Sequence, residues 1–68
     1  MFSIQLRNLR REKKLTQNDL AKILNVSNGT IAMWETNKRE PDLEMLNKIA
    51  NFFNVSLDLL LDRHNNIT

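Results

Sequence analysis

Residues 16–35, Thr-Gln-Asn-Asp-Leu-Ala-Lys-Ile-Leu-Asn-Val-Ser-Asn-Gly-Thr-Ile-Ala-Met-Trp-Glu, form the stretch of sequence that decides the fold. Thr16 and Asp19 have nearly the spacing and chemistry of an N-terminal capping box, in which side chains satisfy the free backbone N–H groups of a first helical turn. We therefore predict a helix over residues 17–24, followed after a short interruption by a second helix over residues 28–35.

Only three residues, 25–27, separate the two predicted helices. Asn25 tolerates the left-handed conformation in which helices end, and Ser27 can cap the next helix. A turn this short forces a steep crossing, so the helices need a small side chain where they meet, and Ala21 meets that need. This is the helix-turn-helix arrangement, in which one helix braces a second that projects into the major groove of DNA.

The rest of the chain contains further helix signals and no alternating pattern of strand length. Three more helices are predicted over residues 4–13, 43–53 and 57–62, with Ser3, Asp42 and Ser56 as their caps. The inward face of the helix over residues 43–53 is expected to consist of Leu43, Leu46, Ile49, Ala50 and Phe53. The expected fold is all-α, a compact bundle of five short helices over residues 1–62, followed by a polar tail at residues 63–68.

Composition excludes several classes of function. The 68 residues include no cysteine and one histidine, His64, and so short a chain leaves little room for a substrate cleft. We therefore expect no enzyme activity, no catalytic residue, no metal site, no cofactor and no small-molecule ligand. No apolar run reaches the roughly 18 residues of a membrane span, so we expect a cytoplasmic, nucleoid-associated protein without a membrane partner.

Charge is distributed unevenly along the chain. Residues 1–39 contain eight Lys or Arg and three Asp or Glu, whereas residues 40–68 contain two and five, so the formal charges of the two parts are +5 and −3. A basic half is the electrostatic pattern expected for a polyanionic partner. Charge alone fits a solvated surface equally well.

A longer ordered set of residues extends over about residues 2–61 without a gap: Leu15-Thr16-Gln17, Leu20-Ala21, Val26-Ser27, Ile31, Trp34-Glu35, Lys38, Pro41, Leu46, Ile49-Ala50, Phe53, Val55-Ser56, Asp58 and Leu60-Leu61. In order and spacing, this set resembles the Cro/lambda-repressor-type (XRE-type) regulators. The resemblance implies a five-helix DNA-binding domain that regulates transcription, as a repressor of bacterial or phage origin and as a homodimer on a palindromic operator. An antitoxin or protein-interaction module with the same fold is the alternative.

Four positions depart from this family, which commonly has glycine where the chain has Lys14, Asn25, Asn37 and Asn54. Asn tolerates positive φ better than other side chains, so we expect the three turns with Asn to keep their backbone. At Lys14 we expect the end of the first helix to be arranged differently. The single glycine, Gly29, lies inside the second helix of the motif, where close approach of DNA or drift at an exposed site accounts for it.

Candidate contact residues follow from position in the motif. The exposed start of the second helix supplies the predicted base-reading residues, which are Asn28, Gly29, Thr30, Ala32 and Met33. They favour A·T pairs because Asn can bind adenine and methyl groups can contact thymine. The predicted phosphate contacts are Gln17, by resemblance, and Ser27, Asn37, Lys38 and Arg39. Partial core packing of Met33 and simple solvation of the loop cations are the alternatives, and the resemblance also implies a structural ion pair between Arg10 and Glu35.

Phe52 and Leu59 are surplus to the inward faces of the last two predicted helices. Phe52 lies about 100° from Phe53 around a helix, so both rings cannot point into one thin core. We expect Phe52 and Leu59, joined by Met45, to form a two-fold contact between two copies of the chain. A looser core that takes in one of the two side chains is the alternative.

Overall fold

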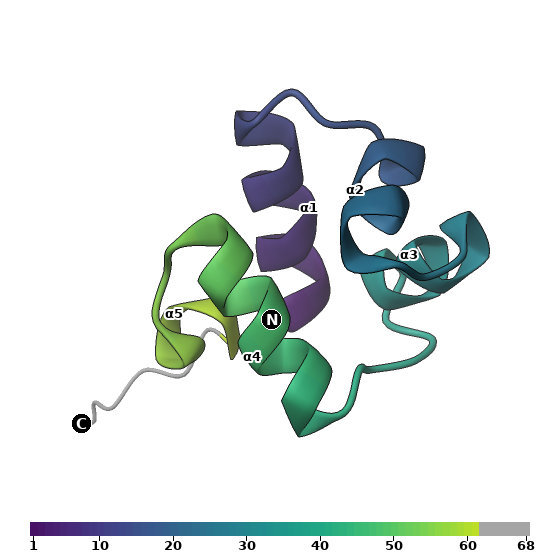
Figure 1. Ribbon diagram of the computed structural model, residues 1–68. Coiled ribbons are helices and arrows are strands. Elements are labelled where there is room, and N and C mark those ends of the chain that lie inside the picture. Colours follow the sequence, from purple (N-terminus) through teal and green to yellow (C-terminus); the bar gives the residue numbers. More distant parts are fainter. Residues whose placement is uncertain (62–68) are drawn as a thin grey trace.

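Five helices make up the part of the chain that the computed structural model describes, residues 1–61 (Figure 1). They are α1 (Phe2–Glu12), α2 (Gln17–Leu24), α3 (Asn28–Glu35), α4 (Leu43–Phe53) and α5 (Leu57–Leu61). The described residues contain no strand, which confirms the predicted all-α bundle. The predicted end of the fifth helix at residue 62, His64 and the tail at residues 63–68 lie outside the described residues.

Helix α1 connects the two halves of the bundle. It contacts α3 on one side and α5 on the other, while α2 packs on α3 and α4 on α5 (Figure 1). Buried apolar side chains from all five helices form one core: Phe2, Leu6, Leu20, Ala21, Leu24, Ile31, Trp34, Ile49, Ala50, Phe53 and Leu60. The helix-turn-helix pair, α2 and α3, is therefore held by the same core as α4 and α5.

The capping box at the start of α2 forms as predicted. Thr16 Oγ1 accepts a hydrogen bond from the Asp19 N–H at 2.9 Å, and the Asp19 carboxylate accepts one from the Thr16 N–H at 3.0 Å. Two hydrogen bonds hold the pKa of Asp19 below its ordinary value. The bond from the Thr16 backbone N–H has the larger effect, and the bond with the Thr16 hydroxyl has the smaller one. Ser27 caps α3 and Asp42 caps α4 in the same way, so these three helices begin at their predicted residues.

The start of α1 differs from the prediction. We expected Ser3 to cap a helix over residues 4–13, but α1 begins at Phe2, its N-cap is Met1, and no side chain caps it. Ser3 is buried inside the first turn. Phe2 and Leu6 lie one turn apart and are both buried, so their packing on the core extends the helix toward the N-terminus.

Within residues 1–61, four residues other than glycine have a left-handed backbone, with φ between 57° and 61°: Lys14, Asn25, Asn37 and Asn54. The expectation that the turns with Asn keep their backbone is confirmed. The expectation for Lys14 is wrong, because the chain adopts the same conformation there, although it costs a residue with a Cβ roughly 1–2 kcal/mol. Hydrogen bonds hold this turn, since Leu15 N–H donates to the Arg10 carbonyl at 3.1 Å and the Arg10 side chain donates to the Leu15 carbonyl at 2.8 Å.

Leu43 does not belong to the inward face of α4, where we expected it. Its side chain is 63% exposed, whereas Ile49 and Phe53 are buried. Leu43 is the first residue of the helix, and the core ends one turn further on, where Met45 and Leu46 are half-buried. The helical spacing of apolar residues does not show where the neighbouring helices end, so it does not predict which end of α4 they cover.

Candidate nucleic-acid interface

Helix α3 buries one side and exposes the other. Ile31, Trp34 and Glu35 are buried, so the opposite side of the helix faces solvent. The structure brings all five predicted base-reading residues to the surface of this helix, with Asn28 and Gly29 exposed and Thr30, Ala32 and Met33 half-buried. Thr36, which the sequence did not single out, is exposed directly after the helix, but its hydroxyl donates to the Ala32 carbonyl at 2.9 Å.

Hydroxyl groups hold the N-terminus of α3. Ser27 Oγ accepts from the Thr30 N–H at 3.1 Å, and the two hydroxyls are hydrogen-bonded to each other at 2.8 Å. The Asn28 side chain is exposed and makes no hydrogen bond within residues 1–61. Asn28 is therefore the polar side chain of this turn that can bind a base edge or a phosphate without first breaking an internal contact.

Gly29 is not required by the fold of α3. Its φ is not positive, and a Cβ placed on it would meet only the Ser27 Oγ, at 3.9 Å, which is an ordinary contact distance. Glycine inside a helix costs about 1 kcal/mol relative to alanine. The helix therefore carries this cost at an open position of its surface, where neither packing nor backbone geometry requires glycine.

The loop after α3 presents Asn37, Lys38 and Arg39 to solvent. The N–H groups of Lys38 and Arg39 donate to the Met33 carbonyl at 2.9 and 3.3 Å, which attaches the loop to the last turn of α3. Neither cation forms an ion pair within the described residues. Their charges therefore lie beside α3 without a carboxylate partner.

A buried ion pair joins α1 to the end of α3. Arg10 Nε donates to Glu35 Oε2 at 2.6 Å, and a terminal guanidinium nitrogen of Arg10 donates to Glu35 Oε1 at 3.0 Å. Glu35 is 3% exposed and Arg10 is 9% exposed. The pair is thus bidentate and shielded from water, which is the geometry in which an Arg–carboxylate contact is strongest.

Opposing effects set the pKa of Glu35. Burial alone would raise the pKa of this carboxyl, but hydrogen bonds from Arg10 and Gln17 and the charges of Arg10 and Arg7 outweigh burial and hold it below its ordinary value. The hydrogen bond to Glu35 raises the pKa of Arg10, against a smaller opposite effect of burial. Both groups are therefore charged at neutral pH.

Two more side chains converge on Glu35, and no local sequence pattern predicts either contact. Gln17 Nε2 donates to Glu35 Oε1 at 3.1 Å. Arg7 donates to the Glu35 backbone carbonyl at 3.0 Å, and its Nε lies 3.7 Å from Glu35 Oε1. One carboxylate thus connects the first turn of α2, the end of α3 and two turns of α1.

The predicted dimer residues are not equally available. Leu59 is 47% exposed, but Phe52 is half-buried against the core and meets Phe53 edge-on, with ring centroids 4.9 Å apart. Lys13 Nζ lies 5.9 Å from the centroid of the Phe52 ring. Met45 is also half-buried. The core therefore takes in Phe52, which was the alternative to its exposure.

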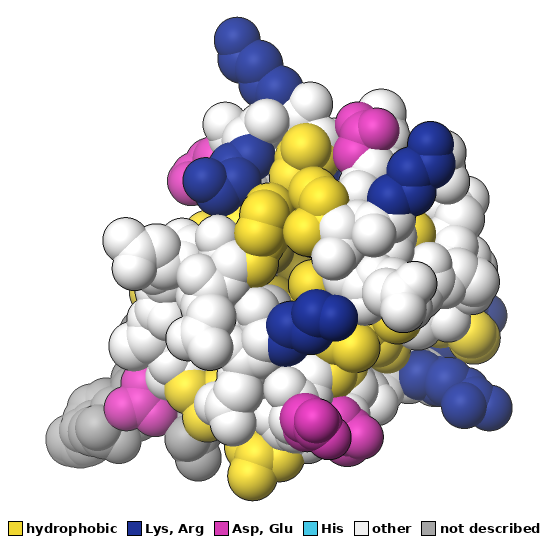
Figure 2. All heavy atoms as spheres, in the orientation of Figure 1, with side chains coloured by type: hydrophobic (Ala, Val, Ile, Leu, Met, Phe, Trp, Pro, Cys, Tyr) yellow, Lys and Arg dark blue, Asp and Glu magenta, His cyan; other side chains and the backbone are white. Residues whose placement is uncertain are grey.

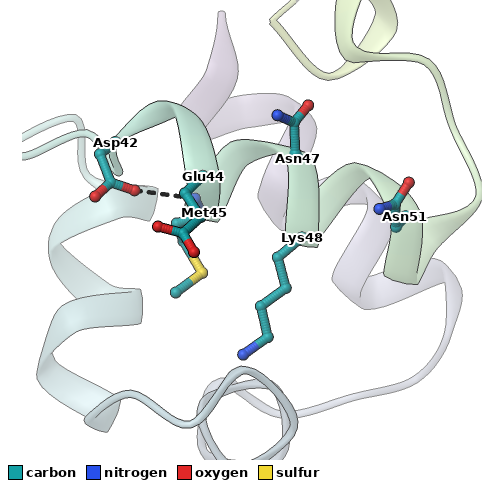
Figure 3. Close-up of a pocket in the computed structure, with 6 residues that line it drawn as sticks. All are labelled: Asp42, Glu44, Met45, Asn47, Lys48 and Asn51. Carbon is teal, nitrogen blue, oxygen red and sulfur yellow. Dashed lines mark hydrogen bonds between the residues drawn. The ribbon is translucent and has the colours of Figure 1, made fainter.

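Two of the hollows on the surface of residues 1–61 border α4. The larger, an open groove of about 560 Å³ along α4, is lined by Asp42, Glu44, Met45, Asn47, Lys48 and Asn51 (Figure 3). Lys48 extends from α4 to the end of α2, where its Nζ donates to the Leu24 carbonyl at 3.1 Å. The smaller hollow, of about 230 Å³, is lined in part by Thr30, Met33 and Arg39. The smaller hollow therefore adjoins the predicted DNA contacts, and the larger one does not.

Cationic side chains lie apart from one another on one face of the molecule. Figure 2 shows Lys and Arg side chains at separate places on the face in view, without a single basic patch. Two short runs contain exposed cations, residues 11–14 at the end of α1 and Lys38-Arg39 after α3. Position beside α3, rather than a broad basic surface, thus distinguishes Lys38 and Arg39.

Comparison with known proteins places the chain in a family. The model of the Helix-turn-helix family matches residues 6–60. The chain is 43% identical over 67 residues to the HTH-type transcriptional activator BcrR of Enterococcus faecalis, a match that covers 98% of this chain and 33% of that protein. It is 35% identical over 68 residues to the cryptic phage CTXphi transcriptional repressor RstR of Vibrio cholerae, covering 98% of this chain and 61% of that protein. A crystal structure of a transcriptional regulator from Listeria innocua matches with a TM-score of 0.90 and 29% identity, covering 100% of this chain and 64% of that one.

The chain therefore belongs to the helix-turn-helix family of Cro/lambda-repressor-like (XRE-type) regulators. This is a family of DNA-binding transcriptional regulators, which are not enzymes. The chain spans 33% to 64% of the length of the three proteins named above. Within residues 1–61, no group of His, Asp or Glu could hold a metal ion, and no helix is long and apolar enough to cross a membrane.

Proposed function

We propose that the chain binds double-stranded DNA sequence-specifically, with α3 in the major groove, and acts as a transcriptional repressor. The observation that carries this proposal is the surface at α3. An uncharged, exposed helix face with an unpartnered Asn28 lies next to the exposed cations Lys38 and Arg39, and the loop that bears them is attached to the same helix. Such a surface combines side chains that reach base edges with charges that reach phosphates.

Readout by α3 favours A·T pairs. Asn28 can donate to and accept from adenine in the major groove, and the side chains of Ala32 and Met33 offer apolar contact to the thymine methyl group. The outward side of α3 carries no Arg or Lys, the residue types that most often read guanine. Shape and flexibility of the DNA supply the remaining specificity.

Repression is the direction of regulation that we propose. The name of the RstR relative supports it, whereas the name of BcrR supports the opposite sign. A reporter transcribed from a promoter that overlaps the bound site decides between them, because a repressor lowers its output and an activator raises it. In cells that carry this reporter, we expect the protein in the cytoplasm, associated with the nucleoid.

The loop cations are expected to set the salt dependence of DNA binding. Lys38→Ala and Arg39→Ala should each weaken binding to every duplex and lower the slope of log Kd against log salt by about one unit, because each removes one phosphate contact. Lys13→Ala is the matched control, since its ammonium lies over the Phe52 ring and should leave the slope unchanged. An unchanged slope in both loop variants would remove the loop from the interface and leave the proposed function without its main support.

A homodimer on a palindromic operator is the assembly that we propose. Leu59 on α5 is a large apolar side chain left exposed on the half of the chain with a net charge of −3, and such a residue suits a two-fold contact. The contact would set two copies of α3 about 34 Å apart, one turn of DNA. Phe52 and Met45, both half-buried, would form the rim of this contact.

Charge at Leu59 is expected to abolish the dimer. Leu59→Glu should remove cooperative binding to a palindromic duplex and leave half-site binding unchanged, which gel-shift titration of both duplexes measures. Leu43→Glu is the matched control, because Leu43 is equally apolar and 63% exposed but lies at the start of α4. Cooperative binding by Leu59→Glu would place the dimer contact elsewhere.

A further inference from the structure

Gln17 occupies an unusual place for a predicted phosphate contact, because one of its N–H groups is already engaged. Its side chain starts from the first residue of α2 and is half-buried. Nε2 donates to Glu35 Oε1 at 3.1 Å. A carboxamide nitrogen has two N–H groups in one plane, so a single hydrogen bond leaves the second N–H in a fixed direction relative to the first.

The acceptor of this hydrogen bond is rigid. Arg10 binds both oxygens of the Glu35 carboxylate, and Glu35 is 3% exposed, so the carboxylate cannot rotate without breaking the buried pair. A glutamine held by such an acceptor has lost most of its rotamer freedom before any ligand binds. Side chains that are ordered in advance bind with less entropic cost.

The surroundings of Glu35 also suit an anion. A lone carboxylate near the DNA backbone would repel a phosphate, but here Arg10 pairs with it directly and Arg7 Nε lies 3.7 Å from it. The two guanidinium groups outweigh one carboxylate. The Arg7 side chain is 41% exposed, so part of this positive charge reaches the surface.

We propose that Glu35 is a positioning residue for DNA binding, whose carboxylate holds the Gln17 carboxamide so that its second N–H donates to a DNA phosphate. This inference rests on the proposed function. It gives the buried ion pair a role in affinity as well as in stability. It also makes the contribution of Gln17 to binding depend on Glu35, a residue that does not touch DNA.

A double-mutant cycle tests this dependence. The binding of a duplex is measured for the 68-residue chain, for Gln17→Ala, for the apolar pair Arg10→Met with Glu35→Leu, and for the three substitutions together. Gln17→Ala should weaken binding about 10-fold in the natural background, the usual effect of a hydrogen bond to a charged group. In the apolar-pair background it should change binding less than about two-fold, since residues in one network couple. Asn47→Ala is the matched control, because this exposed amide lines the groove of α4, where no predicted DNA contact lies, and should leave binding unchanged.

A second measurement covers the case in which the apolar pair does not fold. In the unsubstituted chain, one Nε2 proton of Gln17 should keep its NMR chemical shift when DNA is added, while the other shifts. Movement of both protons would mean that Gln17 leaves Glu35 on binding, and it would overturn the proposal.

The outcomes separate the two proposals. An equal loss from Gln17→Ala in both backgrounds would make Glu35 a purely structural residue, and no loss in the natural background would remove Gln17 from the interface. Either result overturns the positioning role while the unsubstituted chain still binds DNA. Failure of the unsubstituted chain to bind any duplex would overturn the proposed function itself.

Discussion

Replacement of Glu35 by leucine is expected to lower the free energy of unfolding by about 3–5 kcal/mol, because Arg10 then remains buried without its carboxylate. Small domains are stable by only about 5–15 kcal/mol, so the variant should be close to unfolding at room temperature. Urea denaturation followed by circular dichroism measures this loss. Arg7→Met is the matched control: its contact with Glu35 is half-exposed, so it should cost less than about 1 kcal/mol.

Replacing Arg10 as well, so that both residues are apolar, should recover most of the stability that Glu35→Leu loses. Arg10→Met combined with Glu35→Leu removes both charges, and buried ion pairs replaced in this way are often neutral in stability. Losses from Arg10→Met and Glu35→Leu that simply add in the double variant would contradict a direct pair.

The free energy of unfolding of the natural chain should also fall in acid. The folded pKa of Glu35 is lowered, so its contribution is present above the ordinary pKa of a glutamate and disappears as the pH falls through the lower folded value.

Asn28→Ala is expected to cost roughly 1–3 kcal/mol of binding free energy on the preferred duplex and to relax the preference at one base pair. The physical reason is that Asn28 is exposed at the start of α3 and has no hydrogen-bond partner within residues 1–61, so its amide is available to adenine. Competition binding with a library of duplexes measures both effects.

The control for this variant is Asn47→Ala, which removes an exposed amide from the groove of α4, a groove that none of the predicted DNA contacts lines. It should leave affinity and preference unchanged. Equal weakening of preferred and random duplexes by Asn28→Ala would identify Asn28 as a phosphate contact instead of a base-reading residue.

The sequence was sufficient for features that depend on neighbours in the chain. Thr16, Ser27 and Asp42 cap helices by bonding N–H groups three residues away, so the starts of α2, α3 and α4 follow from local side-chain chemistry. The left-handed turns at Asn25 and Asn54 follow from the same kind of reasoning. Position within the motif then placed the predicted base-reading residues on one surface helix.

Features that depend on distant parts of the chain were not predictable in the same way. Ser3 and Leu43 differ from expectation because burial depends on where the neighbouring helices lie: Ser3 is buried, whereas Leu43 is 63% exposed. Gln17 reaches a carboxylate 18 residues away, and Lys48 reaches a carbonyl 24 residues away. A pattern of spacing records which face a residue occupies, but not which side chain it meets there.

The open position at Gly29 has a consequence for how this protein could change its target. A Cβ added there meets only the Ser27 Oγ, at an ordinary contact distance of 3.9 Å, so Gly29→Ala should leave folding intact or improve it. Substitutions that alter specificity must first leave the protein folded, and Gly29→Ala meets that condition. Under the proposed role of α3, position 29 can therefore accept a substitution that alters base preference while the fold is kept.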